Sequence, residues 1–187
     1  MYNKLRFFFI AMAAFLPALA AANMFSVSEQ EINAYLSKKV EINDKFGLPG
    51  LFGVDYSLRD LSVQIGRKDN KRVELSGVLS GLFSLPQKEQ FAGQLNLTID
   101  TIPYYDPEQG AVYLKDIRIL QWSGSPQKYM NQLQTVMPFL SKSVAALMEH
   151  IPIYKLDESK ARDVLIKKFA KGIRVEEGAL ALDAGVL

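Results

Sequence analysis

The stretch QKYMNQLQTVMPFLSKSVAALMEH, residues 127–150, decides how the chain folds. Its apolar residues recur at the spacing of one helix face and fall within about a third of the helical circle. Polar residues such as Gln134 and Lys142 lie on the opposite side. The pattern predicts a helix over residues 126–149 that lies with one face against a sheet. The predicted apolar stripe consists of Tyr129, Leu133, Val136, Met137, Leu140, Val144, Leu147 and Met148.

Pro138 lies in the middle of this predicted helix. Proline has no backbone N–H, and its ring collides with the carbonyl group four residues earlier. We therefore expect a kink at Pro138 that bends the helix along a curved sheet. A break into two shorter helices is the alternative.

Strand-like runs with alternating apolar and polar residues precede the long helix. Short turn sequences separate neighbouring runs, which predicts an antiparallel meander with one packed face and one solvated face. The runs cover residues 54–65, 73–83, 91–99 and 112–119.

The alternation slips by one residue near Asp60 and near Asp116. A slip sends later side chains to the wrong face unless a β-bulge restores the register and increases the local twist. Gly77, Gly81 and Gly93 fall on the inward faces, where glycine permits a tight bend or leaves space. Together these features favour a strongly curved sheet over a flat one.

Shorter elements are expected at both ends of the chain. Residues 26–40 predict a helix that begins with a capping box of Ser28 and Glu31. Residues 44–50, DKFGLPG, are typical of a turn that ends this helix. Asp157 is expected to cap a third helix that runs to Lys171, with Gly172 after its end. The side chains expected to face inward on that helix are Ala161, Val164, Leu165 and Phe169. The last residues predict a small hairpin that turns near Gly178.

Residues 1–22 predict a signal peptide. A basic start is followed by an apolar run that contains Pro17 and ends in small residues, so cleavage is expected after Ala20 or Ala22. An uncleaved membrane anchor is the alternative, but the run is short for a span of roughly 20 residues. We expect residues 23–187 to form a single domain that works in the periplasm.

Charge and cysteine content exclude several classes of function. The formal net charge of +2 comes from Lys4 and Arg6, so the remaining basic and acidic residues balance. Without a basic stripe, nucleic-acid binding is not expected. The chain has no cysteine, which removes disulfides, thiol nucleophiles and thiolate metal sites.

No catalytic motif is present in the sequence. His150 is the only histidine, and no G-x-S-x-G elbow, phosphate-binding loop, dinucleotide fingerprint or EF-hand loop occurs. A histidine at a helix end is more often a partner of the helix dipole than a catalyst. We therefore expect a protein that is not an enzyme and that uses no cofactor or metal.

The chain resembles the YceB-like family of Gram-negative envelope lipoproteins along residues 26–183. The resemblance rests on SEQEIN near the start, GLPG at 47–50, QIGR at 64–67, VELSG at 73–77, QLQTVMPFLSKSV in the long helix and KGIRVEEG near the end. It implies an α+β domain similar to the tubular lipid-binding (BPI-like) fold. In that fold a strongly curved antiparallel sheet wraps around a long helix, and an apolar channel can run between them.

One departure from the family pattern concerns membrane attachment. Lipoprotein members carry a cysteine at the mature N-terminus, and this chain has none. We therefore expect no lipid anchor, and either a soluble periplasmic protein or one held by its uncleaved signal segment.

The favoured function is binding of a lipid or other apolar small molecule between the concave sheet and the helix. The residues predicted to line this space are Tyr56, Leu79, Leu95, Leu97, Leu133, Met137, Leu140 and Val144. Methionine suits such a lining because its side chain adapts to irregular space. The alternative is an envelope structural or interaction protein with a filled core and a protein partner. Leu82, Phe139 and Trp122 would then contribute to an exposed apolar patch.

Overall fold

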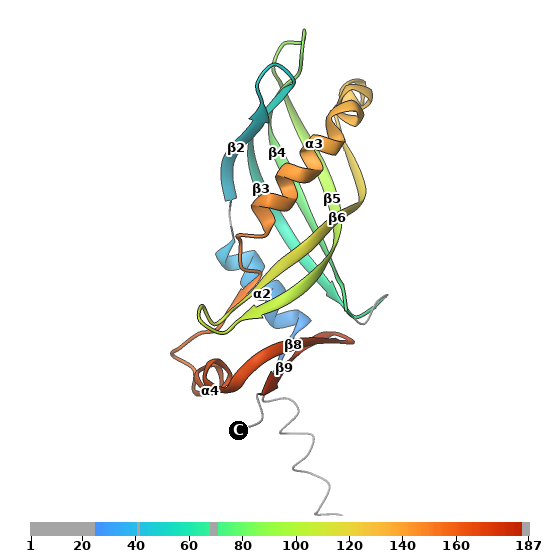
Figure 1. Cartoon of the computed structure of the whole chain (residues 1–187). Helices are drawn as coiled ribbons and strands as arrows, with labels where there is room; N and C mark the ends of the chain where they lie inside the picture. The colour runs from blue at the N-terminus through green and yellow to red at the C-terminus, as the bar shows by residue number, and fades with distance from the viewer. Residues whose placement is uncertain (1–24, 41, 68–70, 185–187) are drawn as a thin grey trace, which may run out of the picture.

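A computed structural model describes residues 25–40, 42–67 and 71–184. The predicted signal peptide, residues 1–22, lies outside the described residues. The described chain is α+β, as predicted. A six-stranded sheet carries the long helix on one face, and a three-stranded sheet lies at one end of the molecule (Figure 1).

The larger sheet is antiparallel throughout, with its strands in chain order. Its central strands confirm the predicted meander. The strands are β2 (Ile42–Leu48), β3 (Phe52–Ile65), β4 (Val73–Ser84), β5 (Phe91–Asp106), β6 (Ala111–Ser125) and β7 (Tyr154–Lys155).

Strand β2 corrects the predicted turn at residues 44–50. Its residues pair with β3 along their whole length, from Ile42 opposite Leu58 to Leu48 opposite Phe52. The apolar alternation of Ile42, Phe46 and Leu48 is interrupted by Asp44, so the extended conformation of β2 depends on the ladder with β3 as well as on local preference. The turn itself falls after β2, where Gly50 has a φ of 78°.

Both predicted register slips coincide with β-bulges. Asp60 and Asp116 have φ angles of 55° and 51°, which places them in the left-handed region. The pairing of β3 with β4 shifts between Arg59 and Ser62, and that of β5 with β6 shifts between Asp100 and Ile102, where Asp116 is the bulged residue. Asp tolerates this backbone conformation better than most residues, which explains its presence at both bulges.

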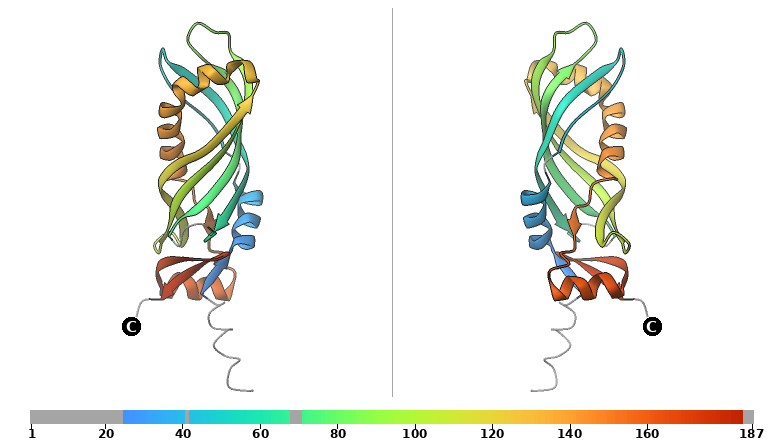
Figure 2. Two further views of the ribbon diagram at one scale, coloured as in Figure 1. Left: turned by 90° about the vertical axis from the view of Figure 1, so that its right-hand side faces the viewer. Right: turned by 90° about the vertical axis from the view of Figure 1, so that its left-hand side faces the viewer.

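The long helix consists of a 3₁₀ turn, η1 (Gln127–Tyr129), and helix α3 (Met130–Met148). Because α3 continues through Pro138, the alternative of two shorter helices is wrong. Its buried face follows the predicted stripe, except that Met130 is buried and Tyr129 and Leu147 are only partly buried. Figure 2 shows α3 as a separate layer beside the sheet.

The smaller sheet joins the two ends of the described chain. Its order is β1 (Ser26–Ser28), β9 (Ala179–Ala184) and β8 (Ala170–Glu176). The predicted hairpin turns at Gly178, which has a φ of 72°. Helix α2 (Glu29–Lys39) begins with the predicted capping box: Glu31 N–H donates to Ser28 Oγ at 3.2 Å, and Ser28 N–H donates to Glu31 Oε2 at 2.9 Å.

Helix α4 (Ala161–Phe169) differs from its prediction at both ends and in its buried face. Lys160 rather than Asp157 is the N-cap residue, and Gly172 lies within β8. The predicted inward residues Ala161, Val164 and Leu165 are exposed. Asp163 and Ile166 are buried instead. The apolar spacing misled the prediction because the helix buries a carboxylate that accepts hydrogen bonds.

Candidate functional site

The predicted ligand-lining residues meet at the interface between the larger sheet and α3. All are buried, with exposed fractions between 0% and 8%, and all belong to one hydrophobic core. The sheet residues are Tyr56, Leu79, Leu95 and Leu97, and the helix residues are Leu133, Met137, Leu140 and Val144. The structure thus brings together side chains from segments that are far apart in the sequence.

The interface contains a cavity of about 20 Å³. Its lining includes Leu97 and Val144 from the predicted set, together with Leu58, Leu61, Leu75, Ser76, Gly77, Ile99 and Met148. A volume of this size is close to that needed for one water molecule. A lipid would fit at this cavity only if α3 moved away from the sheet.

Two of the inward glycines do not leave empty space. A Cβ atom on Gly77 would lie 2.7 Å from Leu61 Cδ2, and one on Gly93 would lie 3.0 Å from the Phe83 ring. Neighbouring side chains therefore occupy the space that these glycines leave. A larger residue at either position would require Leu61 or the Phe83 ring to shift.

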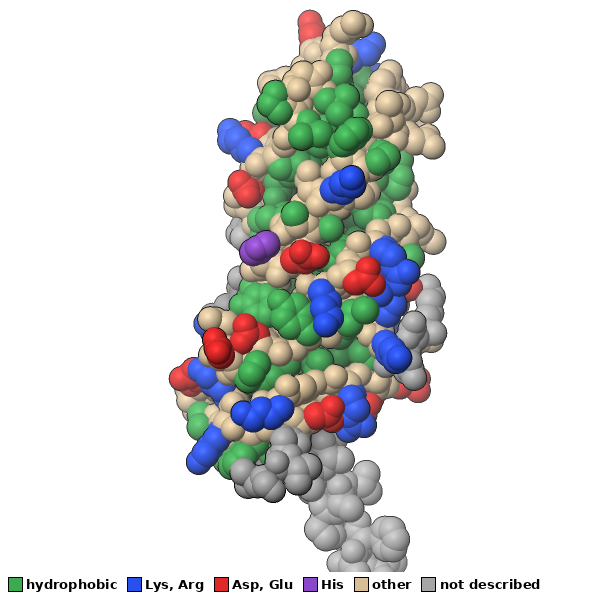
Figure 3. All heavy atoms as spheres, viewed as in Figure 1, with side chains coloured by type: hydrophobic (Ala, Val, Ile, Leu, Met, Phe, Trp, Pro, Cys, Tyr) green, Lys and Arg blue, Asp and Glu red, His purple; other side chains and the backbone are tan. Residues whose placement is uncertain are grey.

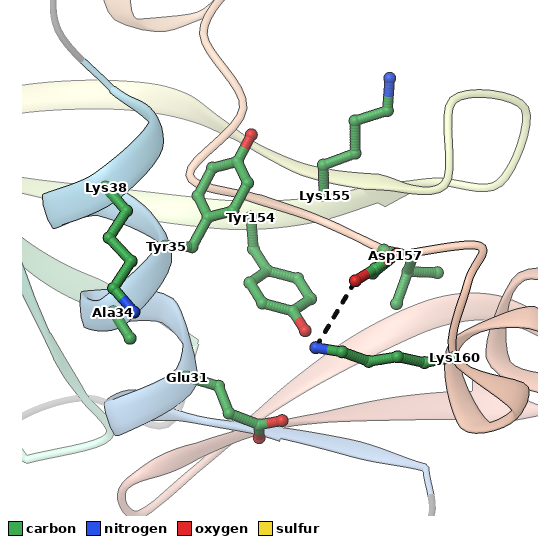
Figure 4. A pocket seen from close by; sticks show the side chains of 9 residues that line it. Glu31, Ala34, Tyr35, Lys38, Tyr154, Lys155, Asp157 and Lys160 are labelled. Atoms are coloured by element: carbon green, nitrogen blue, oxygen red, sulfur yellow. Dashed lines mark ion pairs between the residues drawn. The ribbon is translucent and has the colours of Figure 1, made fainter.

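A pocket of about 530 Å³ lies elsewhere, between α2 and residues 154–160 (Figure 4). The sequence did not indicate this pocket, because its walls come from segments that are far apart in the chain. Its lining residues are Glu31, Ala34, Tyr35, Lys38, Tyr154, Lys155, Leu156, Asp157 and Lys160. We call it the α2–β7 pocket.

One wall of the α2–β7 pocket is aromatic and continuous with the core. The Tyr35 and Tyr154 ring centroids are 5.6 Å apart, with the rings tilted by 57°. Tyr154 and Leu156 are buried members of the hydrophobic core. Burial raises the pKa of Tyr154 to about 12, so its phenol is neutral and can act as a hydrogen-bond donor.

Lysines border the rest of the α2–β7 pocket. In Figure 4, Lys160 reaches across toward the Tyr154 hydroxyl, Lys38 runs along α2 toward Ala34, and Lys155 points away. Lys160 Nζ lies 3.8 Å from Asp157 Oδ2, and both side chains are at least half exposed. Such an exposed pair is weak, so this ammonium remains available to other anions.

A network of ion pairs fixes the base of the α2–β7 pocket. Arg162 donates from Nη2 to Glu31 Oε1 at 2.7 Å and from Nε to Asp163 Oδ1 at 3.0 Å. Asp163 is fully buried, and its Oδ2 accepts the Asp157 N–H at 2.9 Å. Burial alone would lower the pKa of Arg162, but the hydrogen bonds to Glu31 and Asp163 outweigh it and raise that pKa. The network ties α2 to α4 and holds the segment before α4 in place.

The pKa of Glu31 lies below its usual value of 4.5. Burial acts in the opposite direction, but hydrogen bonds from Arg162 and Ser28 favour the carboxylate. A depressed pKa stabilises the fold above the unfolded-state pKa, and this contribution is lost as the pH falls through the folded-state pKa. The Glu31→Gln variant should therefore be less stable than the parent at pH 7, and the difference should shrink below about pH 4.5.

Urea unfolding at a series of pH values measures this difference. The Arg162→Gln background is the control, because removing the donor removes one cause of the pKa shift. In that background the effect of Glu31→Gln should depend less on pH. An equal dependence in both backgrounds would contradict the role of Arg162.

The predicted exposed patch does not form as one surface. Leu82 and Phe139 are exposed at 49% and 41%, whereas Trp122 packs against the core. Trp122 pairs directly with buried Leu97 and so shares the face that α3 covers, while Leu82 lies next to buried Phe83 and faces the other way. On the face that carries α3, hydrophobic and charged side chains are interspersed, and charges gather toward the smaller sheet (Figure 3).

The described residues form neither a membrane-spanning helix nor a metal centre. No helix in residues 25–40, 42–67 and 71–184 is both long and apolar enough to cross a membrane. Within the same residues, no group of three or more Asp, Glu or His side chains is placed to hold a metal ion.

The fold and its core define a small α+β protein with a largely antiparallel sheet. Residues 27–179 match the family described as "Protein of unknown function (DUF1439)", and the chain belongs to this family. It is 32% identical to "Uncharacterized lipoprotein YceB" of Salmonella typhimurium, over 95% of this chain and 97% of that protein. It is 30% identical to the protein of the same name from Escherichia coli, over 84% of this chain and 85% of that protein. The predicted YceB-like resemblance is confirmed.

One solved structure is also similar, a "Crystal structure of lipopolysaccharide binding protein". The sequence identity is 10% and the TM-score is 0.30, over 87% of this chain. The chain spans about half the length of that protein, with 50% covered.

Proposed function

We propose that this protein binds a lipid or other apolar ligand between the larger sheet and α3, in the periplasm and without catalysis. The proposal includes a strongly curved sheet that wraps around a helix kinked at Pro138, as in tubular lipid-binding domains. The bulges at Asp60 and Asp116 support the curvature, because β-bulges increase local twist. The absence of cysteine supports a protein without a lipid anchor.

The observation that carries the proposal is the composition of the sheet–helix interface. Methionines Met130, Met137 and Met148 all lie on the buried face of α3, and Met148 lines the cavity. Methionine has flexible, polarizable side chains that repack around ligands of varied shape. Burying an apolar chain there would be worth about 25 cal/mol per Å² of surface removed from water. A ligand would enlarge the present cavity by displacing α3.

The Leu97→Trp variant tests the proposal, because Leu97 lines the cavity. Native mass spectrometry of the parent protein, purified from the periplasm without detergent, should show a discrete lipid adduct. Leu97→Trp should lose the adduct, because the larger ring occupies the ligand's space. Leu120→Trp is the matched control, since Leu120 is 48% exposed on β6.

If the protein binds no lipid at this interface, both measurements will give a different outcome. The parent would show a clean mass without adduct, even after incubation with phospholipid vesicles. Leu97→Trp would then only overpack a filled core, at a cost of about 1–3 kcal/mol in the free energy of unfolding. This pair of results would reject the lipid proposal and favour the alternative of an envelope interaction protein.

A further inference from the structure

We propose that the α2–β7 pocket is a second ligand site, which binds an organic anion: a phosphate or carboxylate group carried on an apolar chain. The site lies outside the sheet–α3 interface and does not depend on a ligand there. Its volume of about 530 Å³ is within the range of small-molecule pockets, roughly 300–1,000 Å³.

The charges of the pocket favour an anion. Both of its carboxylates already have partners: Glu31 is held by Arg162 and Ser28, and Asp157 accepts hydrogen bonds from Ser159 N–H at 3.1 Å and Oγ at 2.6 Å. Within the described residues, Lys38 takes part in no hydrogen bond or ion pair. The ammonium groups of Lys38 and Lys160 are therefore available to a ligand.

The geometry gives the anion specific donors. Lys160 extends toward the Tyr154 hydroxyl, and Lys38 lies along the facing helix (Figure 4). An anionic group between them would accept charge-assisted hydrogen bonds from both ammonium groups, and these bonds are stronger than neutral ones. The weak, exposed pair of Lys160 with Asp157 would be the interaction that the ligand replaces.

The remaining wall favours an apolar group attached to the anion. Tyr35 presents a half-buried aromatic ring, and Leu156 is 6% exposed and belongs to the core. Ala34 leaves space between α2 and this wall because its side chain is small. An inorganic anion would leave these surfaces in contact with water, so an amphiphile fits the whole pocket better.

The pocket is held in shape before any ligand arrives. Asp163 accepts the Asp157 N–H at 2.9 Å and thereby fixes the segment that carries Lys160. Arg162 joins that segment to α2 through Glu31 at 2.7 Å. A preformed site loses less entropy on binding than a mobile one, which favours binding of a small ligand.

Isothermal titration calorimetry on the protein expressed from the full chain tests this proposal with octyl phosphate and octanoate. At least one of them should bind about tenfold more tightly than inorganic phosphate or the neutral amphiphile octyl glucoside. The Lys38→Gln/Lys160→Gln double variant should weaken that binding about tenfold. The matched control is Lys88→Gln/Lys142→Gln, which removes the same charge at exposed positions away from the pocket.

A steric variant separates this site from the sheet–α3 interface. Ala34→Trp should block binding of the anionic amphiphile, whereas Leu97→Trp should leave it unchanged. Thermal melts should show that both lysine double variants and Ala34→Trp remain folded. The substituted residues are all exposed: Ala34, Lys38, Lys88, Lys142 and Lys160.

Several results would overturn the proposal. Equal affinity for octyl glucoside would show that the anion is not recognised, and equal affinity for inorganic phosphate would show that the apolar wall is not used. Binding that survives both Ala34→Trp and the Lys38→Gln/Lys160→Gln variant would place the ligand elsewhere. If Leu97→Trp lost binding while Ala34→Trp and the Lys38→Gln/Lys160→Gln variant kept it, the ligand would lie at the sheet–α3 interface. Only the function proposed above would then remain.

Discussion

Replacing Asp163 by alanine should lower the free energy of unfolding by about 2–4 kcal/mol. Asp163 is fully buried and accepts hydrogen bonds from the Asp157 N–H and from Arg162 Nε. Alanine would leave the partly buried Asp157 N–H without an acceptor and would remove one of the two carboxylates around Arg162. The expected loss stays below that of a fully uncompensated charge, because Arg162 is 31% exposed and keeps Glu31.

Urea unfolding followed by far-UV circular dichroism measures this change, and two variants serve as controls. Asp163→Asn keeps an acceptor of the same shape for the Asp157 N–H and should cost less than alanine. Asp157→Ala removes an exposed carboxylate from the same segment and should cost no more than about 1 kcal/mol. If Asp163→Ala proved as mild as Asp157→Ala, the network at the base of the α2–β7 pocket would not support the fold.

Local patterns sufficed to predict several elements of the fold. The capping box of Ser28 and Glu31 is a hydrogen-bonding pattern within four residues, so the sequence alone identifies the start of α2. The bulges at Asp60 and Asp116 could be predicted because residues on the two faces of a strand alternate along the sequence, so a slip in this alternation indicates a bulge. The inward stripe of α3 was visible for the same reason at helical spacing.

Other elements depended on contacts between distant segments. In strand β2 the apolar alternation is interrupted by Asp44 and the segment contains turn-forming residues, and the strand is extended because β3 supplies a continuous ladder. The buried face of α4 was predicted wrongly because Asp163 is buried by its hydrogen bonds to Arg162 and the Asp157 N–H, which no apolar pattern reveals. The α2–β7 pocket combines residues of α2 with residues 154–160, so neither segment alone indicated a site.

The predicted lining of the sheet–α3 interface was brought together by the fold, yet it lies in a closely packed core around a small cavity. The same side chains therefore serve two purposes under the proposed function: they stabilise the ligand-free protein and form the wall of the ligand space when α3 moves. How tightly these side chains pack without a ligand decides how much free energy a ligand must supply to move α3 away from the sheet.

Replacing Leu140 by alanine should lower the free energy of unfolding by about 2–5 kcal/mol. Leu140 is 1% exposed on the face of α3 that packs against the sheet. The substitution removes apolar contacts and leaves a cavity that the surrounding sheet can fill only in part. The neighbouring Phe139 is 41% exposed, so Phe139→Ala should change stability by only about 0.5 kcal/mol although it removes a larger side chain.

Urea unfolding of the two variants under the same conditions gives the comparison. The enlarged space in Leu140→Ala should also increase the uptake of an apolar ligand relative to the parent, as measured by native mass spectrometry after incubation with phospholipid vesicles. A loss below about 1 kcal/mol for Leu140→Ala would contradict close packing at this interface, because typical buried Leu→Ala losses are larger. That result would mean that α3 already lies loosely on the sheet, and a ligand would then enter without having to displace it.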